Sequence, residues 1–329
     1  MFQTEVNHFL QSLDYQWLQL LMQYVSRLGY QPFYIAALLI IVFGVDAHKG
    51  IGLLQVLLGV AIVTTFLKEL LALPRPLDVD NTLRFLGTNY NPPNILFAKR
   101  GAASFWEMLP DDVIAYYRVN RLSSFGFPSG HVSGAVAFFG GIALVFPLPY
   151  TRVLAGILCL LMAISRMYLG VHFLADVVGG LLIGILGLSI LYIWQYKRHV
   201  VKNFVQESKY RLLLANVVWL LLPFMLWLLP YMNKELLITL FACNIFYLAF
   251  KWLGCPMPNG SFLRRAFAII VACVSFIAFS LLTNKLLQML NFVNENAQMI
   301  TLRLAEFSVA LVVALYANLQ LGLMHPQKK

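Results

Sequence analysis

Residues 171–195 read VHFLADVVGGLLIGILGLSILYIWQ, an apolar run that contains one histidine and one carboxylate near its start. The run is longer than the ~20 apolar residues that a helix needs to cross a bilayer. Lipid offers no hydrogen-bond partner to the backbone, so a run of this kind must be helical. The stretch therefore predicts a transmembrane helix with polar groups gathered at one end.

The composition of the whole chain extends this prediction. Hydrophobic residues make up 60% of the 329 residues, charged residues make up 12%, and the mean hydropathy is +0.76. This balance excludes an ordinary soluble chain, and the short alternating segments of a β-barrel do not appear. We predict an all-α fold, a polytopic integral membrane helical bundle of about nine transmembrane helices. The expected spans are 31–47, 51–73, 129–147, 152–169, 171–195, 211–231, 235–253, 263–284 and 301–324.

Three parts are expected along the chain. Residues 1–30 lack the basic start and long apolar run of a cleavable signal peptide. Their spaced apolar residues are typical of an amphipathic helix on the membrane surface, and a tenth span is the alternative. Residues 31–196 hold every motif that could carry chemistry. Residues 197–329 add further helices, interpreted as scaffold or dimer surface, or as a wall that shapes substrate access.

Loop charges predict the orientation in the membrane. Basic residues crowd the segment 197–211, which the positive-inside rule places in the cytoplasm. The loop 77–127 is near neutral, with five basic and five acidic residues, and its aromatic side chains fit either a lid or a loop packed on the membrane. We expect a bacterial inner membrane protein with its site facing the periplasm, or an ER membrane protein in a eukaryote. The net charge of +10 has no nucleic-acid-binding motif behind it.

Two cations define the first motif, KELLALPRP at residues 68–76. Lys68 and Arg75 are seven residues apart, so they share a helix face if the helix continues through Leu73. A lysine within an apolar stretch is costly and marks a functional candidate, although a lysine that snorkels to the interface is the plainer alternative. Arg75 by itself reads as an ordinary interfacial arginine.

The second motif is Pro128-Ser129-Gly130-His131, which is expected to open a helix. Proline suits the first helical turn, and the free N–H groups of the next three residues would form an anion site. Gly130 allows close approach of a phosphate. Ser129 could donate its hydroxyl or merely cap the helix. His131 beside an anion could act as a general acid.

The third motif consists of Ser165-Arg166 followed by His172 and Asp176. His172 and Asp176 stand four residues apart, on one helix face. A carboxylate in an apolar helix needs a partner, and His172 is the evident one. A carboxylate on Nδ1–H would leave Nε2 free to face a substrate. The alternative is a purely structural buried ion pair.

Together the motifs indicate phosphoryl transfer, because three cations suit a phosphate dianion and two histidines suit a nucleophile and an acid. In this order they match Lys-x6-Arg-Pro, Pro-Ser-Gly-His and Ser-Arg-x5-His-x3-Asp. The chain thus resembles the type 2 phosphatidic acid phosphatase superfamily, which includes lipid phosphate phosphatases, glucose-6-phosphatases and vanadium haloperoxidases. The resemblance covers about residues 30–195.

The resemblance implies a role for each matching residue. His172 would be the nucleophile that forms a phosphohistidine, Asp176 would orient it, and His131 would protonate the leaving oxygen. The phosphoryl oxygens would be held by Lys68, Arg75, Ser129, Gly130 and Arg166. Such enzymes need no metal, and no cofactor is expected. The four cysteines form no Cys-x-x-Cys pair, and no disulfide or metal site is expected from them.

We therefore expect a membrane phosphatase acting on a phosphate or diphosphate monoester, with a lipid phosphate favoured because the site opens at bilayer depth. Two spans precede the first motif and about four follow the third. This layout is similar to that of the glucose-6-phosphatase and sphingosine-phosphate phosphatase branches, so a sugar phosphate remains an alternative substrate. Two further alternatives are an enzyme that transfers the phosphoryl group to a lipid acceptor, and a non-catalytic lipid-binding or transport protein. The expected partners are the phosphomonoester substrate and membrane lipids; the oligomeric state stays open.

Overall fold

The structure is a computed structural model that describes residues 1–329 except 88–96, 121–123, 197–208, 290–308 and 328–329. Most of the basic segment 197–211 and part of the expected span 301–324 lie outside the described residues. Within them the fold is all-α, as predicted, and the strands are two residues long. Contacts divide the chain into two compact units, residues 1–34 with 59–192, and residues 35–58 with 193–329.

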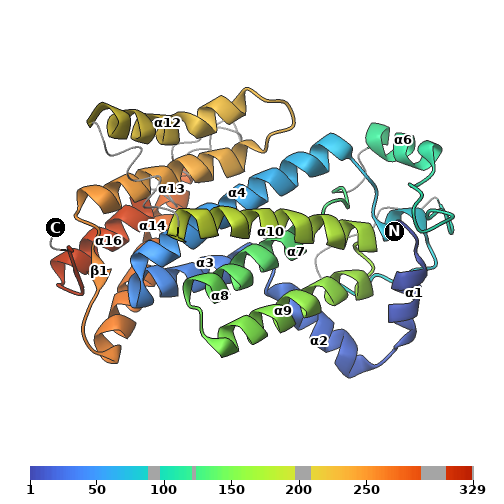
Figure 1. Ribbon diagram of the computed structural model, residues 1–329, viewed down its shortest axis with the longest axis horizontal. Coiled ribbons are helices and arrows are strands. Elements are labelled where there is room, and N and C mark those ends of the chain that lie inside the picture. Colours follow the sequence, from blue (N-terminus) through green and yellow to red (C-terminus); the bar gives the residue numbers. More distant parts are fainter. Residues whose placement is uncertain (88–96, 121–123, 197–208, 290–308, 328–329) are drawn as a thin grey trace. The chain divides into compact units, whose positions relative to one another are not determined.

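The first unit holds the three motifs. Its helices are formed by apolar stretches that are bounded by Gly, Pro or polar residues. Pro149, for example, stands at the start of α9, as expected for a first helical turn. Figure 1 shows α2 lying alongside α9, against which it packs. The helices that lie wholly or mainly in this unit are α1 (Glu5–Ser12), α2 (Gln16–Arg27), α5 (Pro76–Val79), α6 (Asp111–Asn120), α7 (Gly130–Ala135), η2 (Val136–Gly140), α8 (Gly141–Val145), α9 (Pro149–Tyr168) and α10 (Leu174–Tyr196).

Helices α3 (Gln31–Ile40) and α4 (Ala47–Leu71) pass from one unit to the other. The second unit otherwise holds the C-terminal helices, in which α12 packs on α13 and α14 packs on α16. Two short strands pair antiparallel, with Met257 opposite His325. The elements are η1 (Ile41–Val45), α12 (Lys209–Trp227), α13 (Lys234–Trp252), β1 (Met257–Pro258), α14 (Phe262–Met289), α16 (Ala310–Gln320) and β2 (Met324–His325).

Five described helices are long and apolar enough to cross a membrane: Ala47–Val79, Pro149–Tyr168, Leu174–Gln195, Lys234–Trp252 and Phe262–Thr283. The bent pair Gln16–Arg27 and Gln31–Val45 makes a sixth if it is one span. Shorter apolar helices occupy Gly130–Val145, Leu213–Trp227 and Ala310–Gln320, where three further spans were expected. The membrane character is therefore clear, and the count of nine stays a prediction.

Two apolar clusters support the loops that carry the motifs. Phe173 and Leu73, which neighbour the third and first motifs, belong to one cluster together with Phe2 from the N-terminus. Leu77 and Val171 belong to a second cluster with Met22 of α2. The N-terminal helices thus share their core with the loops that position the motifs.

Candidate active site

The first motif does not lie on one continuous helix, contrary to the sequence expectation. Helix α4 ends at Leu71, and Ala72 adopts a positive φ of 48°, which turns the chain away from the helix axis. Lys68 therefore does not share a helix face with Arg75. Its ammonium group donates to the carbonyl oxygens of Phe125 and Gly126, both at 2.8 Å. Lys68 thus stabilises the segment that leads into the second motif.

Arg75 is buried and held at several points. Its guanidinium donates through Nε to the Ser124 carbonyl at 2.6 Å and through Nη2 to the Ser124 hydroxyl at 2.7 Å. Its backbone N–H donates to the Asp78 carboxylate at 2.8 Å, at the start of α5. Because these hydrogen bonds fix the orientation of the guanidinium, its positive charge is held in one place, which suits recognition of phosphate oxygens.

The second motif opens a helix, but one residue later than expected. Ser129 is the N-cap, α7 begins at Gly130, and Pro128 precedes the cap. The sequence analysis expected the Ser129 N–H to be free to bind an anion. Instead it donates to the Asp176 backbone carbonyl at 2.9 Å. Gly180 of α10 also packs here: a Cβ added to it would lie 2.6 Å from the Ser129 carbonyl oxygen. The second and third motifs are thus joined through the backbone.

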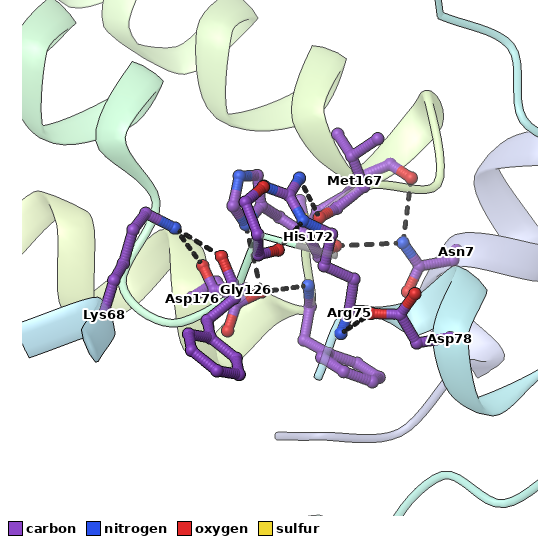
Figure 2. A network of polar contacts seen from close by, with 12 residues as sticks. Asn7, Lys68, Arg75, Asp78, Gly126, Met167, His172 and Asp176 are labelled. Atoms are coloured by element: carbon purple, nitrogen blue, oxygen red, sulfur yellow. Dashed lines mark hydrogen bonds and ion pairs between the residues drawn. The ribbon is translucent and has the colours of Figure 1, made fainter. Parts of the chain in front are cut away.

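The predicted contact between His172 and Asp176 is present, at 3.1 Å from Nδ1 to Oδ2 (Figure 2). His172 lies in the loop between α9 and α10, not on the helix, since α10 begins at Leu174. The same Asp176 oxygen accepts the Phe173 backbone N–H at 2.9 Å. Asp176 therefore fixes both the imidazole and the loop that carries it.

Charge and burial set the protonation of His172. Burial lowers the pKa of this imidazole well below its usual value, and the charges of Arg75, Lys68 and Arg166 lower that pKa further. The ring is therefore neutral near pH 7. When Nδ1–H donates to Asp176, the lone pair of Nε2 remains available as a nucleophile.

A cavity of about 190 Å³ lies among these elements. Three of the predicted site residues, Arg75, His131 and Arg166, are on its lining, while the other five are not. The remaining lining residues come from α2 and the turn after it, from the loop after α5, from the segment before the second motif and from the segment before His172: Gln23, Ser26, Tyr30, Phe85, Gly87, Ser124, Leu169 and Val171. The loop 77–127 thus contributes to the wall, and it carries the helices α5 and α6.

Three buried polar atoms around the motifs have no hydrogen-bond partner among the described residues. They are the Ser129 hydroxyl oxygen, His131 Nε2 and Arg166 Nε. Buried polar atoms are normally bonded, because an unsatisfied one costs free energy. Polar atoms that carry a hydrogen, next to two arginines, fit the oxygens of a phosphate group.

Gly130 adds a steric observation. A Cβ built on it would meet only the Thr64 methyl, at 3.7 Å, an ordinary contact. Protein packing therefore does not demand glycine there, and the space beside its backbone remains open to a bound group. This agrees with the expectation that a phosphate approaches the backbone at this position.

Sequence reasoning missed several residues that touch the motifs. Ser26 accepts a short hydrogen bond from Arg166 Nη1, and the Tyr30 ring meets the His131 ring edge to face, with centroids 4.7 Å apart. A detectable signal was present: Gln23 and Ser26 are three residues apart on one helix face, and Tyr30 follows four residues later, beyond the end of α2. Asn7 and Ser124 carried no comparable signal.

Comparisons with known proteins agree with the motifs. A family model described as the PAP2 superfamily matches residues 49–199. The chain is 45% identical over 73 residues to phosphatidylglycerophosphatase B of Bacillus subtilis (strain 168), covering 20% of this chain and 36% of the relative. It is 39% identical over 107 residues to "Putative undecaprenyl-diphosphatase YbjG" of Escherichia coli (strain K12), covering 31% and 51%.

The matches thus span about half or less of each relative's own length. No solved structure gives a significant match. All eight predicted site residues fall inside the segment that the family model matches. The match to the PAP2 superfamily model over residues 49–199 thus covers the same part of the chain as the three motifs.

Proposed function

We propose that the chain is a membrane phosphatase that hydrolyses a phosphate or diphosphate monoester of a lipid through a phosphohistidine intermediate. One observation carries the proposal: Arg75, His131 and Arg166 line a cavity, and their motifs also hold the Ser129 hydroxyl, which has no partner among the described residues, and a neutral histidine bonded to a carboxylate. Cations and neutral donors suit phosphate oxygens, and a held imidazole suits nucleophilic attack. The names of the two relatives, a phosphatidylglycerophosphatase and an undecaprenyl-diphosphatase, favour a lipid substrate.

The reaction runs in two steps. His172 Nε2 attacks phosphorus, the P–O bond to the leaving group breaks, and His131 gives its proton to the departing oxygen. Water then attacks the phosphohistidine while His131 takes a proton from it, the N–P bond breaks, and phosphate leaves. A bound phosphate dianion favours the protonated form of His131. Substrate binding thereby supplies the acid when it is needed.

The polar side chains among the lining residues are those of Gln23, Ser26, Tyr30, Arg75, Ser124, His131 and Arg166, and none of these is a carboxylate. Mg²⁺ prefers oxygen ligands, so we propose that charge neutralisation by the arginines and Lys68 replaces a metal. Positioning and electrostatics supply most of the rate in phosphoryl transfer. The site is proposed to face the periplasm or the lumen, because of the basic residues at 197–211.

The test is phosphate release by the purified protein from a panel of substrates, with and without a metal chelator. The panel contains phosphatidic acid, phosphatidylglycerophosphate, an isoprenoid diphosphate, a sphingoid phosphate and glucose 6-phosphate. We expect turnover of a lipid substrate that survives the chelator, and an acid-labile phosphoenzyme that His172→Ala abolishes. Turnover of glucose 6-phosphate alone would replace the lipid by a sugar phosphate. Normal turnover by His172→Ala would exclude the mechanism.

A further inference from the structure

We propose that residues 1–30, which precede the PAP2 segment, complete its active site. Asn7, Ser26 and Gly29 act as positioning residues for His172, Arg166 and His131. The proposal rests on the proposed function and adds to it, because residues 1–30 lie outside the family match.

Asn7 reaches the loop of the nucleophile (Figure 2). Its side chain is completely buried, and Nδ2 donates to the Met167 carbonyl at 2.9 Å and to the His172 carbonyl at 3.0 Å. Met167 follows Arg166 in α9, so one amide joins the end of that helix to the loop of His172. The two hydrogen bonds fix the spacing between the nucleophile and a phosphate-binding arginine.

Helix α1 is anchored well enough to serve this purpose. His8 contacts the Asp80 carboxylate at 2.9 Å. Gln11 and Arg84 exchange two hydrogen bonds: Gln11 Nε2 donates to the Arg84 carbonyl at 2.8 Å, and the Arg84 N–H donates to Gln11 Oε1 at 3.0 Å. The Phe2 ring packs against the Phe173 ring, which follows His172, with centroids 5.6 Å apart. Asn7 is therefore held by contacts on both sides of it in sequence.

Helix α2 supports the other two groups. The Ser26 hydroxyl, itself buried, accepts from Arg166 Nη1 and so directs that guanidinium. Beyond the end of α2, Gly29 lies so close to His131 that an added Cβ would be 2.3 Å from imidazole Cδ2. No side chain fits at that distance, so any residue other than glycine must displace the ring. Tyr30 touches the same ring.

Polar residues on α2 and just beyond its end are also part of the cavity wall. Gln23, Ser26 and Tyr30 line the cavity together with Arg75, His131 and Arg166. The Gln23 amide is held by the Leu86 carbonyl at 2.7 Å, while Trp17 and Tyr24 on the same helix are exposed. The two faces of α2 therefore differ, and the face with Gln23 and Ser26 lines the cavity.

The first experiment compares Gly29→Ala with Gly156→Ala. Gly156 lies in α9 of the same unit, and an added Cβ there meets nothing within 4 Å. Because Gly29→Ala displaces the proposed acid, we expect kcat for the lipid substrate to fall at least about tenfold, within the range that acid–base catalysis supplies. The loss should be smaller for p-nitrophenyl phosphate, whose leaving group needs no proton. Gly156→Ala should match the wild type on both substrates.

The second experiment compares Asn7→Asp with Asn7→Ala. If Asn7 acts through its two donors, the carboxylate should lower kcat at least as far as alanine does, since it would face two carbonyl oxygens. If Asn7 only fills space, the isosteric Asn7→Asp variant should be the more active one. Size-exclusion profiles and melting temperatures in detergent show which variants fold.

The outcomes separate the two proposals. A wild-type protein that turns over no substrate would overturn the proposed function and this inference with it. An active wild type with Gly29→Ala equal to Gly156→Ala, or with equal losses for both leaving groups, would overturn the inference alone. So would an Asn7→Asp variant with wild-type kcat, because the donors would then be dispensable.

Discussion

Replacement of Asp176 by asparagine tests how the nucleophile is oriented. Both contacts of this carboxylate converge on one oxygen: Oδ2 accepts from His172 Nδ1 and from the Phe173 N–H, while Oδ1 has no partner among the described residues. An asparagine can therefore place its carbonyl oxygen where Oδ2 stands and its amide group where Oδ1 stands. The Phe173 N–H selects that orientation, and the tautomer of His172 is preserved.

The expected loss follows from charge alone. A hydrogen bond to a charged group contributes about 1.5–3 kcal/mol, against about 0.5–1.5 kcal/mol for a neutral one. The difference of about 1–2 kcal/mol corresponds to a fall of about 5- to 30-fold in kcat. Asp176→Ala removes the acceptor from two buried donors, which costs about 1–3 kcal/mol for each. We expect that variant to be at least about tenfold slower than Asp176→Asn.

The assay is single-turnover formation of the phosphoenzyme, which isolates the attack by His172 from product release. Wild type, Asp176→Asn, Asp176→Ala and His172→Ala are compared in the same detergent. A loss for Asp176→Asn as complete as that for His172→Ala would refute the reasoning. It would mean that the amide turns its NH₂ group toward the imidazole and imposes the wrong tautomer.

Four further predictions follow from the same geometry. His131→Ala should slow turnover of lipid substrates far more than that of p-nitrophenyl phosphate; equal losses in the two steady-state rates would argue against its acid role. Gly130→Ala should keep the wild-type melting temperature, because the added methyl meets an ordinary contact, yet should raise KM for phosphate esters; an unchanged KM would show that phosphate does not approach there. Burial raises the pKa of Asp80, but hydrogen bonds from Thr82 and His8 outweigh it and bring that pKa down to about 2 from 3.8. Ionised Asp80 thus contributes about 2 kcal/mol above pH 3.8, a contribution that is lost as the pH falls to 2. Asp80→Asn should lower the melting temperature at pH 7, with a gap to wild type that closes below pH 4; a constant gap would contradict this. Cysteines at Ala103 and Val201, in a background without the native cysteines, should react with an impermeant thiol reagent from outside only at position 103, and the reverse pattern would invert the topology.

The sequence predicted one contact within the candidate site but not the backbone geometry around it. The contact between His172 and Asp176 was predictable because four-residue spacing brings two side chains together at a helix start. The break of α4 was not, since seven-residue spacing suits one helix face only if the helix continues, and Ala72 gives no sign of its positive φ. The role of the Ser129 N–H was equally hidden, because its acceptor lies 47 residues further along the chain.

The N-terminal segment shows the main limit of reading a pattern locally. Asn7 and Gln11 lie on a short amphipathic helix, which by its periodicity resembles a surface helix. Both side chains are buried, because they bond to backbone groups about 160 residues away. Residue spacing within a helix does not predict a hydrogen-bond partner so far away in the sequence. Membrane spans were predictable from hydropathy, but three of the nine expected spans appear as shorter apolar helices.

The bond from Ser129 to Asp176, together with the close packing of Gly180 on the same backbone, has a consequence for how substrate enters. The proposed general acid and the proposed nucleophile are therefore joined through the backbone, and we expect these two motifs to stay together when a lipid substrate enters. Gln23 and Ser26 of α2 also line the cavity, as do Phe85 and Gly87, and we expect entry to occur by displacement of these parts of its wall. On this proposal the two histidines keep their relative positions during turnover, while the wall residues around them move.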